Sequence, residues 1–271
     1  LPVTVRQARD RLRGAGLLPE PVAPPPSAPP RRRPFARRAP AAVELRGVWH
    51  ELRDGPAILR GIDLRLDPGE RVVLMGRNGA GKSTLLRHAK GLLEPTRGRV
   101  SRAGEVALLM QNPGDYLIHE RADQEVDAAG LAAAGLEGRG GADPRDLSGG
   151  ERQRLALEIV LAAGRPAAVC LDEPTRGMDR SWKANLAGRL AALAGDGCAV
   201  LVATHDTEFA AELADRVVLL GQGDVIADGP VGEVLTGGWH FSTEVARVLG
   251  GAGGALTPES GARTLRRELV P

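Results

Sequence analysis

Residues 71–84, RVVLMGRNGAGKST, set the architecture that we expect for this chain. The apolar run at 71–75 is typical of a strand buried on both faces of a parallel sheet. The residues after it fit the pattern G-x-x-x-x-G-K-[ST] and lead into a helical pattern, which is the context that a phosphate-binding turn requires. A glycine-rich turn that binds nothing is the alternative, and this context disfavours it. The turn comprises Gly76, Arg77, Asn78, Gly79, Ala80, Gly81, Lys82, Ser83 and Thr84.

The chemistry expected of this turn follows from its residue types. Glycines allow the backbone to curl so that successive N–H groups point at phosphate oxygens. The helix that follows adds the positive end of its dipole. Lys82 supplies a mobile cation to the β and γ phosphates of a nucleotide, and the Ser83 hydroxyl is a ligand for Mg²⁺.

The rest of the chain alternates between apolar runs and helical patterns. Buried strands are expected at 106–110, 167–171, 199–204 and 216–220, and helices at 82–93, 151–164 and 181–195. Strands that alternate with helices predict an α/β fold with a mostly parallel sheet. Before the first buried strand, the alternating segments 43–49 and 62–67 predict an antiparallel β subdomain. Between Gln111 and Leu147 the pattern breaks, which predicts a small α-helical subdomain with a glycine-rich end.

The two ends of the chain differ from the middle. Residues 1 to about 20 have a helical pattern, and residues 19–40 are dense in proline and arginine. Proline-rich sequence cannot form a packed core, so we expect an extended linker there. Its arginines could contact anionic lipid or nucleic acid, but a solvated linker is the favoured interpretation. After about Thr236 come two short helical patterns, the second with Thr257 as its N-cap and Pro258 in its first turn.

Composition narrows the class of protein. The net charge of +2 and the aromatic content of 3% argue against a nucleic-acid-binding platform. No apolar run approaches the roughly 20 residues that span a bilayer, so a membrane role would depend on a partner. Cys170 and Cys198 both lie in apolar runs, which predicts buried, reduced thiols. The sequence begins with Leu1 rather than methionine, which indicates a fragment or the later half of a longer chain.

A pair of acidic residues follows the apolar run that ends at Leu171. Asp172 can hold the hydration shell of Mg²⁺, and Glu173 can orient or deprotonate an attacking water. Many strands end in acidic residues, so this pair is a weak signal alone. Together with the phosphate-binding turn it predicts nucleotide hydrolysis.

The sequence LSGGERQ at 147–153 opens a helical pattern. Ser148 and Glu151 fit a capping box, so an ordinary capped helix is one interpretation. Ser148, Gly149 and Gly150 at a helix start are also suited to bind an anion. In this order, the three motifs resemble those of the ABC ATPases, which have a P-loop NTPase core. In that family the serine-glycine-glycine signature closes over the γ-phosphate of ATP held by another cassette.

The resemblance covers about residues 43–235 and extends to single positions. Gln111 matches a glutamine near Mg²⁺ and the attacking water, Asp179 matches the aspartate of the loop after the acidic strand, and His205 matches a histidine that senses the γ-phosphate. The implied catalytic residues are Glu173, His205 and Gln111, the implied Mg²⁺ ligands are Ser83, Gln111 and Asp172, and the implied substrate is ATP. The implied domains are a linker at 1–40, an ATPase domain at 41–236 with its helical subdomain at about 112–163, and a helical tail at 237–271.

One position departs from the family pattern. An aromatic side chain usually stacks on adenine from the early strand, and the corresponding position here is Leu52, close to Trp49 and His50. We therefore expect weak recognition of the base.

Within the family, the chain is most similar to the ATPases of energy-coupling-factor transporters. The residues that carry this similarity are 111–116 (QNPGDY), 173–179 (EPTRGMD) and the tail from Thr243 to Leu265. The similarity implies an importer of a vitamin or metal ion, peripheral on the cytoplasmic face of the plasma membrane. It implies two partners, a second cassette in a head-to-tail dimer and an integral membrane subunit, and no nucleic acid. The linker at 1–40 would then join two fused cassettes.

Three other classes of ABC protein are alternatives. A soluble ATPase that acts on ribosomes typically has a charged helical linker, whereas the linker here is proline-rich. A DNA-repair or chromosome-structure ATPase requires a long coiled coil between Lys82 and Ser148, and no heptad pattern occurs there. A degenerate cassette that binds but does not cleave ATP is disfavoured by the presence of Glu173 and His205.

Overall fold

The computed structural model describes residues 4–18, 40–53, 55–162, 164–236 and 241–268. The expected linker lies outside the described residues except for Pro40, so its extended character stays a prediction. The helix expected near the N-terminus is present as α1 (Val5–Gly14).

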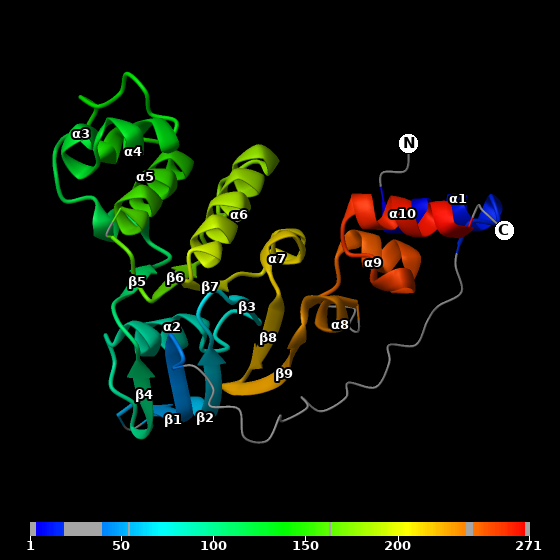
Figure 1. Cartoon of the computed structure of the whole chain (residues 1–271), viewed down its shortest axis with the longest axis horizontal. Helices are drawn as coiled ribbons and strands as arrows, with labels where there is room; N and C mark the ends of the chain where they lie inside the picture. Colours follow the sequence, from blue (N-terminus) through cyan, green and yellow to red (C-terminus); the bar gives the residue numbers. More distant parts are fainter. Residues whose placement is uncertain (1–3, 19–39, 54, 163, 237–240, 269–271) are drawn as a thin grey trace.

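A six-stranded sheet forms the centre of the molecule, in the order β5-β6-β7-β3-β8-β9 (Figure 1). Its strands are β3 (Arg71–Met75), β5 (Val106–Leu109), β6 (Ala168–Asp172), β7 (Ala199–Ala203), β8 (Arg216–Gly221) and β9 (Asp224–Pro230). The first five strands in this order are parallel, which confirms the expected α/β fold. The edge strand β9 was not expected, and it pairs antiparallel with β8.

Alternate residues of each central strand serve two hydrophobic cores. Val73 and Met75 of β3 pack with α5 (Gly149–Leu161), α6 (Arg180–Gly195) and α7 (Thr207–Leu213) on one face. Val72 and Leu74 pack with α2 (Lys82–Lys90) and the antiparallel strands on the other face. Because both faces are covered, the strands read as continuous apolar runs in the sequence.

A second, three-stranded sheet has the order β2-β1-β4, with β1 (Val43–Glu51), β2 (Ala57–Leu66) and β4 (Arg97–Arg102). Both pairings are antiparallel, as expected for β1 and β2. Strand β4, RGRVSR, was missed because its side chains are exposed except for the half-buried Val100. Its pairing with β1, and not its own pattern, makes it a strand.

The helical subdomain rises above the sheet at the upper left of Figure 1. It contains η1 (Pro113–Tyr116), α3 (Ala122–Glu125), α4 (Ala128–Ala133), η2 (Pro144–Asp146) and α5. Leu131, Leu136 and Leu155 belong to its own small core. It is joined to α6 by the nearly buried Glu158, whose Oε2 accepts a hydrogen bond of 2.7 Å from Nη2 of Arg189.

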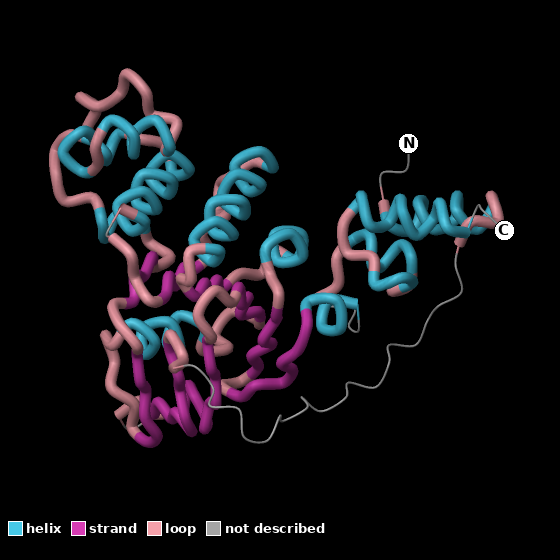
Figure 2. Tube along the Cα trace, in the orientation of Figure 1, coloured by secondary structure: helices cyan, strands magenta, loops and turns pink. Residues whose placement is uncertain are grey.

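The C-terminal part forms α8 (Val231–Thr236), α9 (Glu244–Leu249), η3 (Ala252–Gly254) and α10 (Pro258–Glu268). The Thr257 hydroxyl accepts from the Ser260 N–H at 3.3 Å, as expected for an N-cap. Helix α1 lies beside this tail (Figures 1 and 2), where Leu12 packs against the cluster of Leu249, Ala252 and Ala255. Helix α1 and the tail therefore form one small helical layer that sequence patterns alone did not predict.

Both cysteines are buried free thiols, as expected, and burial raises the pKa of Cys170 to about 12. In the part of the chain that the structure covers, the helices lack the length and apolarity needed to cross a bilayer.

Leu190 tests the packing of α6 on the sheet, because its side chain is fully buried while Leu92 is 56% exposed. Replacement of Leu190 with alanine removes buried apolar contact and leaves a cavity, so the free energy of unfolding should fall by about 2–5 kcal/mol. Urea unfolding measures it. The control Leu92→Ala should change the value by no more than about 0.5 kcal/mol, and equal effects of the two variants would contradict the packing described.

Candidate active site

The turn between β3 and α2 has the shape expected of a phosphate cradle. Gly76 has φ 152° and Gly81 has φ 103°, conformations that other residues rarely adopt. A Cβ on Gly76 would lie 2.3 Å from the carbonyl oxygen of Leu220, and a Cβ on Gly81 would lie 2.8 Å from Cδ2 of Leu59. Only glycine fits at both positions, so the backbone itself forms the inner surface of the turn.

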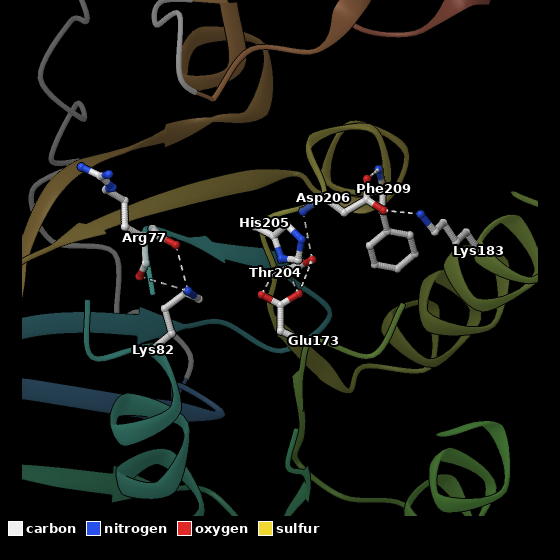
Figure 3. A network of polar contacts seen from close by, with 9 residues as sticks. Arg77, Lys82, Glu173, Lys183, Thr204, His205, Asp206 and Phe209 are labelled. Atoms are coloured by element: carbon white, nitrogen blue, oxygen red, sulfur yellow. Dashed lines mark hydrogen bonds and ion pairs between the residues drawn. The ribbon is translucent and has the colours of Figure 1, made fainter. Parts of the chain in front are cut away.

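Lys82 lies inside this turn and is only 7% exposed. Its Nζ donates to the carbonyl oxygens of Gly76 at 2.8 Å and Arg77 at 3.4 Å (Figure 3). An ammonium has three donors, so these contacts hold the cation at the turn and leave a further donor for a phosphate oxygen.

Asp172 and Ser83 meet beside Lys82. The Asp172 carboxylate is 4% exposed and accepts a hydrogen bond from the Ser83 side chain. Burial raises the pKa of the Asp172 carboxyl above its ordinary value, with the Glu173 charge adding to the rise and the Ser83 hydrogen bond and Lys82 charge opposing it. A buried carboxylate next to a hydroxyl is an oxygen donor set that suits Mg²⁺, and a bound cation would relieve the cost of ionising Asp172.

Glu173 directly follows β6 and is positioned by two residues that directly follow β7. Nδ1 of His205 lies 2.9 Å from both carboxylate oxygens, and the Thr204 hydroxyl donates to Oε2 at 3.2 Å (Figure 3). Contact with an ionised carboxylate requires the proton on Nδ1, which leaves Nε2 of a neutral ring as an acceptor. Glu173 also has φ 50°, an uncommon value for a residue with a side chain. The carboxylate is therefore oriented by Thr204 and His205 at the end of β7.

The segment that carries His205 is itself anchored. Nζ of Lys183 lies 2.6 Å from Oδ2 of Asp206, and Oδ1 of Asp206 accepts from the Phe209 N–H at 3.0 Å (Figure 3). Burial acts to raise the pKa of Asp206, but these two hydrogen bonds outweigh it and the pKa is lowered. The ion pair therefore fixes the loop between β7 and α7.

An open pocket of about 800 Å³ brings most of the expected residues together. The expected residues that line it are Asn78, Gly79, Gly81, Lys82, Ser83, Thr84, Gln111, Asp172, Glu173 and His205. Ile58 and Arg176 also line the pocket, which the sequence did not predict. Arg176 lies within the EPTRGMD segment, whose sequence did not reveal which way its side chain points.

Other expected residues lie elsewhere on the chain. Gly76, Arg77 and Ala80 shape the turn without lining the pocket. The Asp179 carboxylate accepts from the Trp182 N–H at 3.0 Å as the N-cap of α6, and this bond lowers its pKa. Leu52 is 47% exposed and is not among the lining residues, whereas Ile58 is, and the weak recognition of the base expected from Leu52 stays a prediction.

The residues at 148–150 form the capped start of α5. The Ser148 hydroxyl accepts from the Glu151 N–H at 3.3 Å, and the Glu151 carboxylate accepts from the Ser148 N–H at 2.8 Å, which confirms the capping box. Gly149 and Gly150 line a separate pocket and not the one around Lys82. Within one chain, the two anion-binding helix starts therefore do not share a site.

The family model described as ABC transporter matches residues 59–176. A putative ABC transporter ATP-binding protein of Streptomyces coelicolor is 44% identical, over 92% of this chain and 53% of that protein. The energy-coupling factor transporter ATP-binding protein EcfA of Methanothermobacter thermautotrophicus is 34% identical, over 71% of this chain and 72% of that protein. The chain spans about half the length of the first curated relatives it matches, 53% and 42%.

Solved structures show the same fold. CbiO1 from Clostridium perfringens, part of the ABC transporter complex CbiONQ, has a TM-score of 0.61 and 25% identity, with 72% of this chain and 90% of that chain covered. A dimeric ATP-binding cassette in a post-hydrolysis state bound to ADP and Pi has a TM-score of 0.63 and 26% identity, with 70% and 98% covered.

The buried Asp172 predicts a pH-dependent effect on stability. Because the folded state raises the pKa of this acid, stability is highest below the unfolded-state pKa and falls as the pH rises through the folded-state pKa. Asp172→Asn should therefore increase the free energy of unfolding of the nucleotide-free chain at pH 7. The gain should shrink as the pH is lowered towards 4. Urea unfolding across this range measures the effect.

Asp215→Asn is the matched control, because the hydrogen bond from Arg71 lowers the pKa of Asp215. Its carboxylate stabilises the fold above the unfolded-state pKa, so this variant should lose stability at pH 7. A loss of stability in Asp172→Asn at pH 7 would show that the ionised Asp172 does not destabilise the nucleotide-free chain.

Proposed function

The chain belongs to the ABC transporter ATP-binding protein family, and from this premise we propose that it hydrolyses ATP to drive transport. The observation that carries the proposal is the orientation of Glu173 by His205 and Thr204, beside the cradle formed around Lys82. A carboxylate held at this place is suited to accept a proton from a water molecule that attacks the γ-phosphate.

The residues of the pocket have different roles in the reaction. The N–H groups of the turn and the Lys82 ammonium bind the β and γ phosphates, while Ser83, Asp172 and Gln111 would hold Mg²⁺. Mg²⁺, when bound, offsets the negative charge that develops on the phosphate oxygens. Glu173 takes the proton of the attacking water as the water oxygen bonds to phosphorus and ADP leaves. Because Nδ1 of His205 is engaged by Glu173, Nε2 is left for the γ-phosphate, to which it would donate a hydrogen bond when both ring nitrogens carry a proton.

A facing cassette would complete the site. The signature residues Ser148, Gly149 and Gly150, together with Asp179, lie outside the pocket around Lys82. Two cassettes placed head to tail would bring the signature of one over the nucleotide of the other. The dimeric state of a similar cassette supports this arrangement. The greater length of the Streptomyces coelicolor relative supports a version in which both cassettes, joined by residues 1–40, belong to one protein.

The transport role rests on the relatives. EcfA proteins of two methanogens are 34% and 32% identical to the chain, which supports an energy-coupling-factor type of importer for a vitamin or metal ion. A membrane subunit would bind residues 111–120, where Ile118 is 75% exposed, and the cassette would be peripheral on the cytoplasmic face of the membrane. We assign residues 41–236 to the ATPase domain and 237–271 to its tail.

The first activity prediction separates binding from hydrolysis. Glu173→Gln keeps the size of the side chain but removes the base, so phosphate production should fall by roughly 10²-fold or more while ATP affinity is retained. Lys82→Ala removes a charge-assisted contact and should weaken ATP binding by about tenfold or more. Turnover by a phosphate assay and affinity by a fluorescent ATP analogue measure the two effects. Normal turnover in Glu173→Gln would reject the role of the base.

The second activity prediction concerns the facing cassette. With hydrolysis blocked by Glu173→Gln, Mg-ATP should produce a dimer of the chain, because ATP bridges the turn of one copy and the signature of the other. Adding Ser148→Arg should abolish that dimer, since a bulky side chain then fills the place of the γ-phosphate at the start of α5. Light scattering with and without Mg-ATP makes the comparison. Persistence of the ATP-dependent dimer in the double variant would exclude this interface.

A further inference from the structure

His205 lies in the loop between β7 and α7, where packing holds its side chain only weakly. This side chain is 77% exposed, so its place depends on its contact with Glu173 and on the backbone that carries it. Thr204 precedes it and is fully buried, and its N–H donates to the carbonyl oxygen of Leu74 at 3.1 Å. Asp206 follows it and is the N-cap of α7. The position of His205 is therefore set by what holds its two neighbours.

Asp206 is joined to Glu173 through the Thr204 hydroxyl (Figure 3). The N–H of Asp206 donates to this hydroxyl oxygen at 3.1 Å, which closes a tight turn around His205. The hydroxyl donates its own proton to Oε2 of Glu173 at 3.2 Å. A hydroxyl has one proton, so the bond accepted from Asp206 leaves that proton free for the carboxylate. The place of the Asp206 backbone therefore affects the orientation of the base.

Lys183 holds Asp206 from a different helix. It lies on α6, and its Nζ is 2.6 Å from Oδ2 of Asp206 (Figure 3). The other carboxylate oxygen accepts from the Phe209 N–H at 3.0 Å. The Asp206 side chain is only 16% exposed, so salt and water screen this ion pair less than they screen an exposed pair. The carboxylate is thus held at both oxygens, by α6 on one side and by α7 on the other.

Negative charge gathers around the start of α7. The Glu208 carboxylate accepts from the Glu244 N–H at 2.9 Å, and burial raises its pKa, with the charges of the neighbouring carboxylates adding to the rise. Among the residues that the structure describes, Asp206, Glu208, Glu212 and Glu244 form one ion pair in all, that of Asp206 with Lys183. Loss of the Lys183 charge would therefore leave mutual repulsion between these groups without a paired cation.

We infer that Lys183 is a positioning residue for ATP hydrolysis, which holds the Glu173 base through Asp206 and the adjoining loop. Lys183 does not line the pocket around Lys82, so it acts through other residues. Its ammonium fixes the Asp206 carboxylate, and the N–H of the same residue fixes the Thr204 hydroxyl that orients the base. A small displacement of a base slows the chemical step, while the contacts that bind the nucleotide are left in place. This role rests on the proposed hydrolysis of ATP.

Lys183→Met tests this role, because methionine keeps an unbranched side chain and removes the charge. The kcat for ATP should fall by about tenfold or more, while KM stays within about twofold of the native value, because the residues expected to contact ATP are unchanged. Lys183→Arg keeps a cation for the carboxylate and should hold kcat within about threefold of native. Phosphate release over a range of Mg-ATP concentrations measures both constants.

Lys90→Met is the matched control. The side chains of Lys90 and Lys183 are each 31% exposed and each forms an ion pair, but Lys90 pairs with the exposed Glu105 at 3.7 Å. Lys90 is the last residue of α2, at the end away from the phosphate-binding turn. The same substitution there should leave kcat within about twofold of native. Equal losses of kcat in Lys90→Met and Lys183→Met would refute a specific role for Lys183.

Asp206→Asn separates loss of position from the effect of an unpaired carboxylate. Asparagine also caps helices, so its Oδ1 can keep the Phe209 N–H, but an amide nitrogen then replaces Oδ2 and cannot accept from the Lys183 ammonium. The kcat should therefore fall as it does in Lys183→Met, again with little change in KM. Native kcat in Asp206→Asn would show that the ion pair does not position the base.

The Glu173→Gln background distinguishes a role through the base from a general structural role. There, adding Lys183→Met should change the residual single-turnover rate by no more than about twofold, because the base that Lys183 positions is already absent. An equal fold loss with and without Glu173 would overturn the inference. Native turnover that Lys183→Met leaves unchanged would overturn it and leave the proposed function standing, whereas absence of turnover in the native chain would overturn both.

Discussion

The turn at residues 76–81 lies so close to its neighbours that it has no room for side chains at two positions, and the phosphate site is built around this restriction. The carbonyl oxygen of Leu220 and the side chain of Leu59 occupy the space that side chains at Gly76 and Gly81 would need. Leu220 belongs to β8 and Leu59 to β2, so the turn is clamped between the two sheets. A backbone held in this way can present N–H groups to phosphate without reorganising, which is the condition for strong electrostatic binding.

The same region contains a buried carboxylate that is costly to ionise when no ligand is bound. Asp172 is buried with its pKa raised, and Glu173 lies beside it in an uncommon backbone conformation. Such local costs are typical of functional sites, where a ligand compensates them. A cation between Ser83 and Asp172 would turn an unfavourable carboxylate into a ligand, so stability and nucleotide binding are coupled through one side chain.

Arg176 lies at the boundary between the pocket around Lys82 and the start of α5. From the turn after β6 it reaches the pocket around Lys82 and also the pocket beside α5. The packing of Gly177 on Gly150 keeps this turn against the helical subdomain. A movement of that subdomain would therefore displace the turn that carries Arg176, and Glu173 lies only three residues before Arg176 in the sequence. This geometry links the site of bond cleavage to the surface that a second cassette would contact.

Local sequence patterns were enough to predict the features that depend on neighbours along the chain. The strand, glycine turn and helix at 71–90, the capping box of Ser148, and the buried parallel strands all follow from local periodicity and side-chain type. Contacts between distant segments could be known only from the three-dimensional arrangement. The polar strands β4 and β9 exist because β1 and β8 satisfy their backbone groups. Thr204 meets Glu173, and α1 packs on α9, across separations that no local pattern records. The physical reason is that hydrogen bonds and burial act through space, while periodicity reports only which face of its own element a residue occupies.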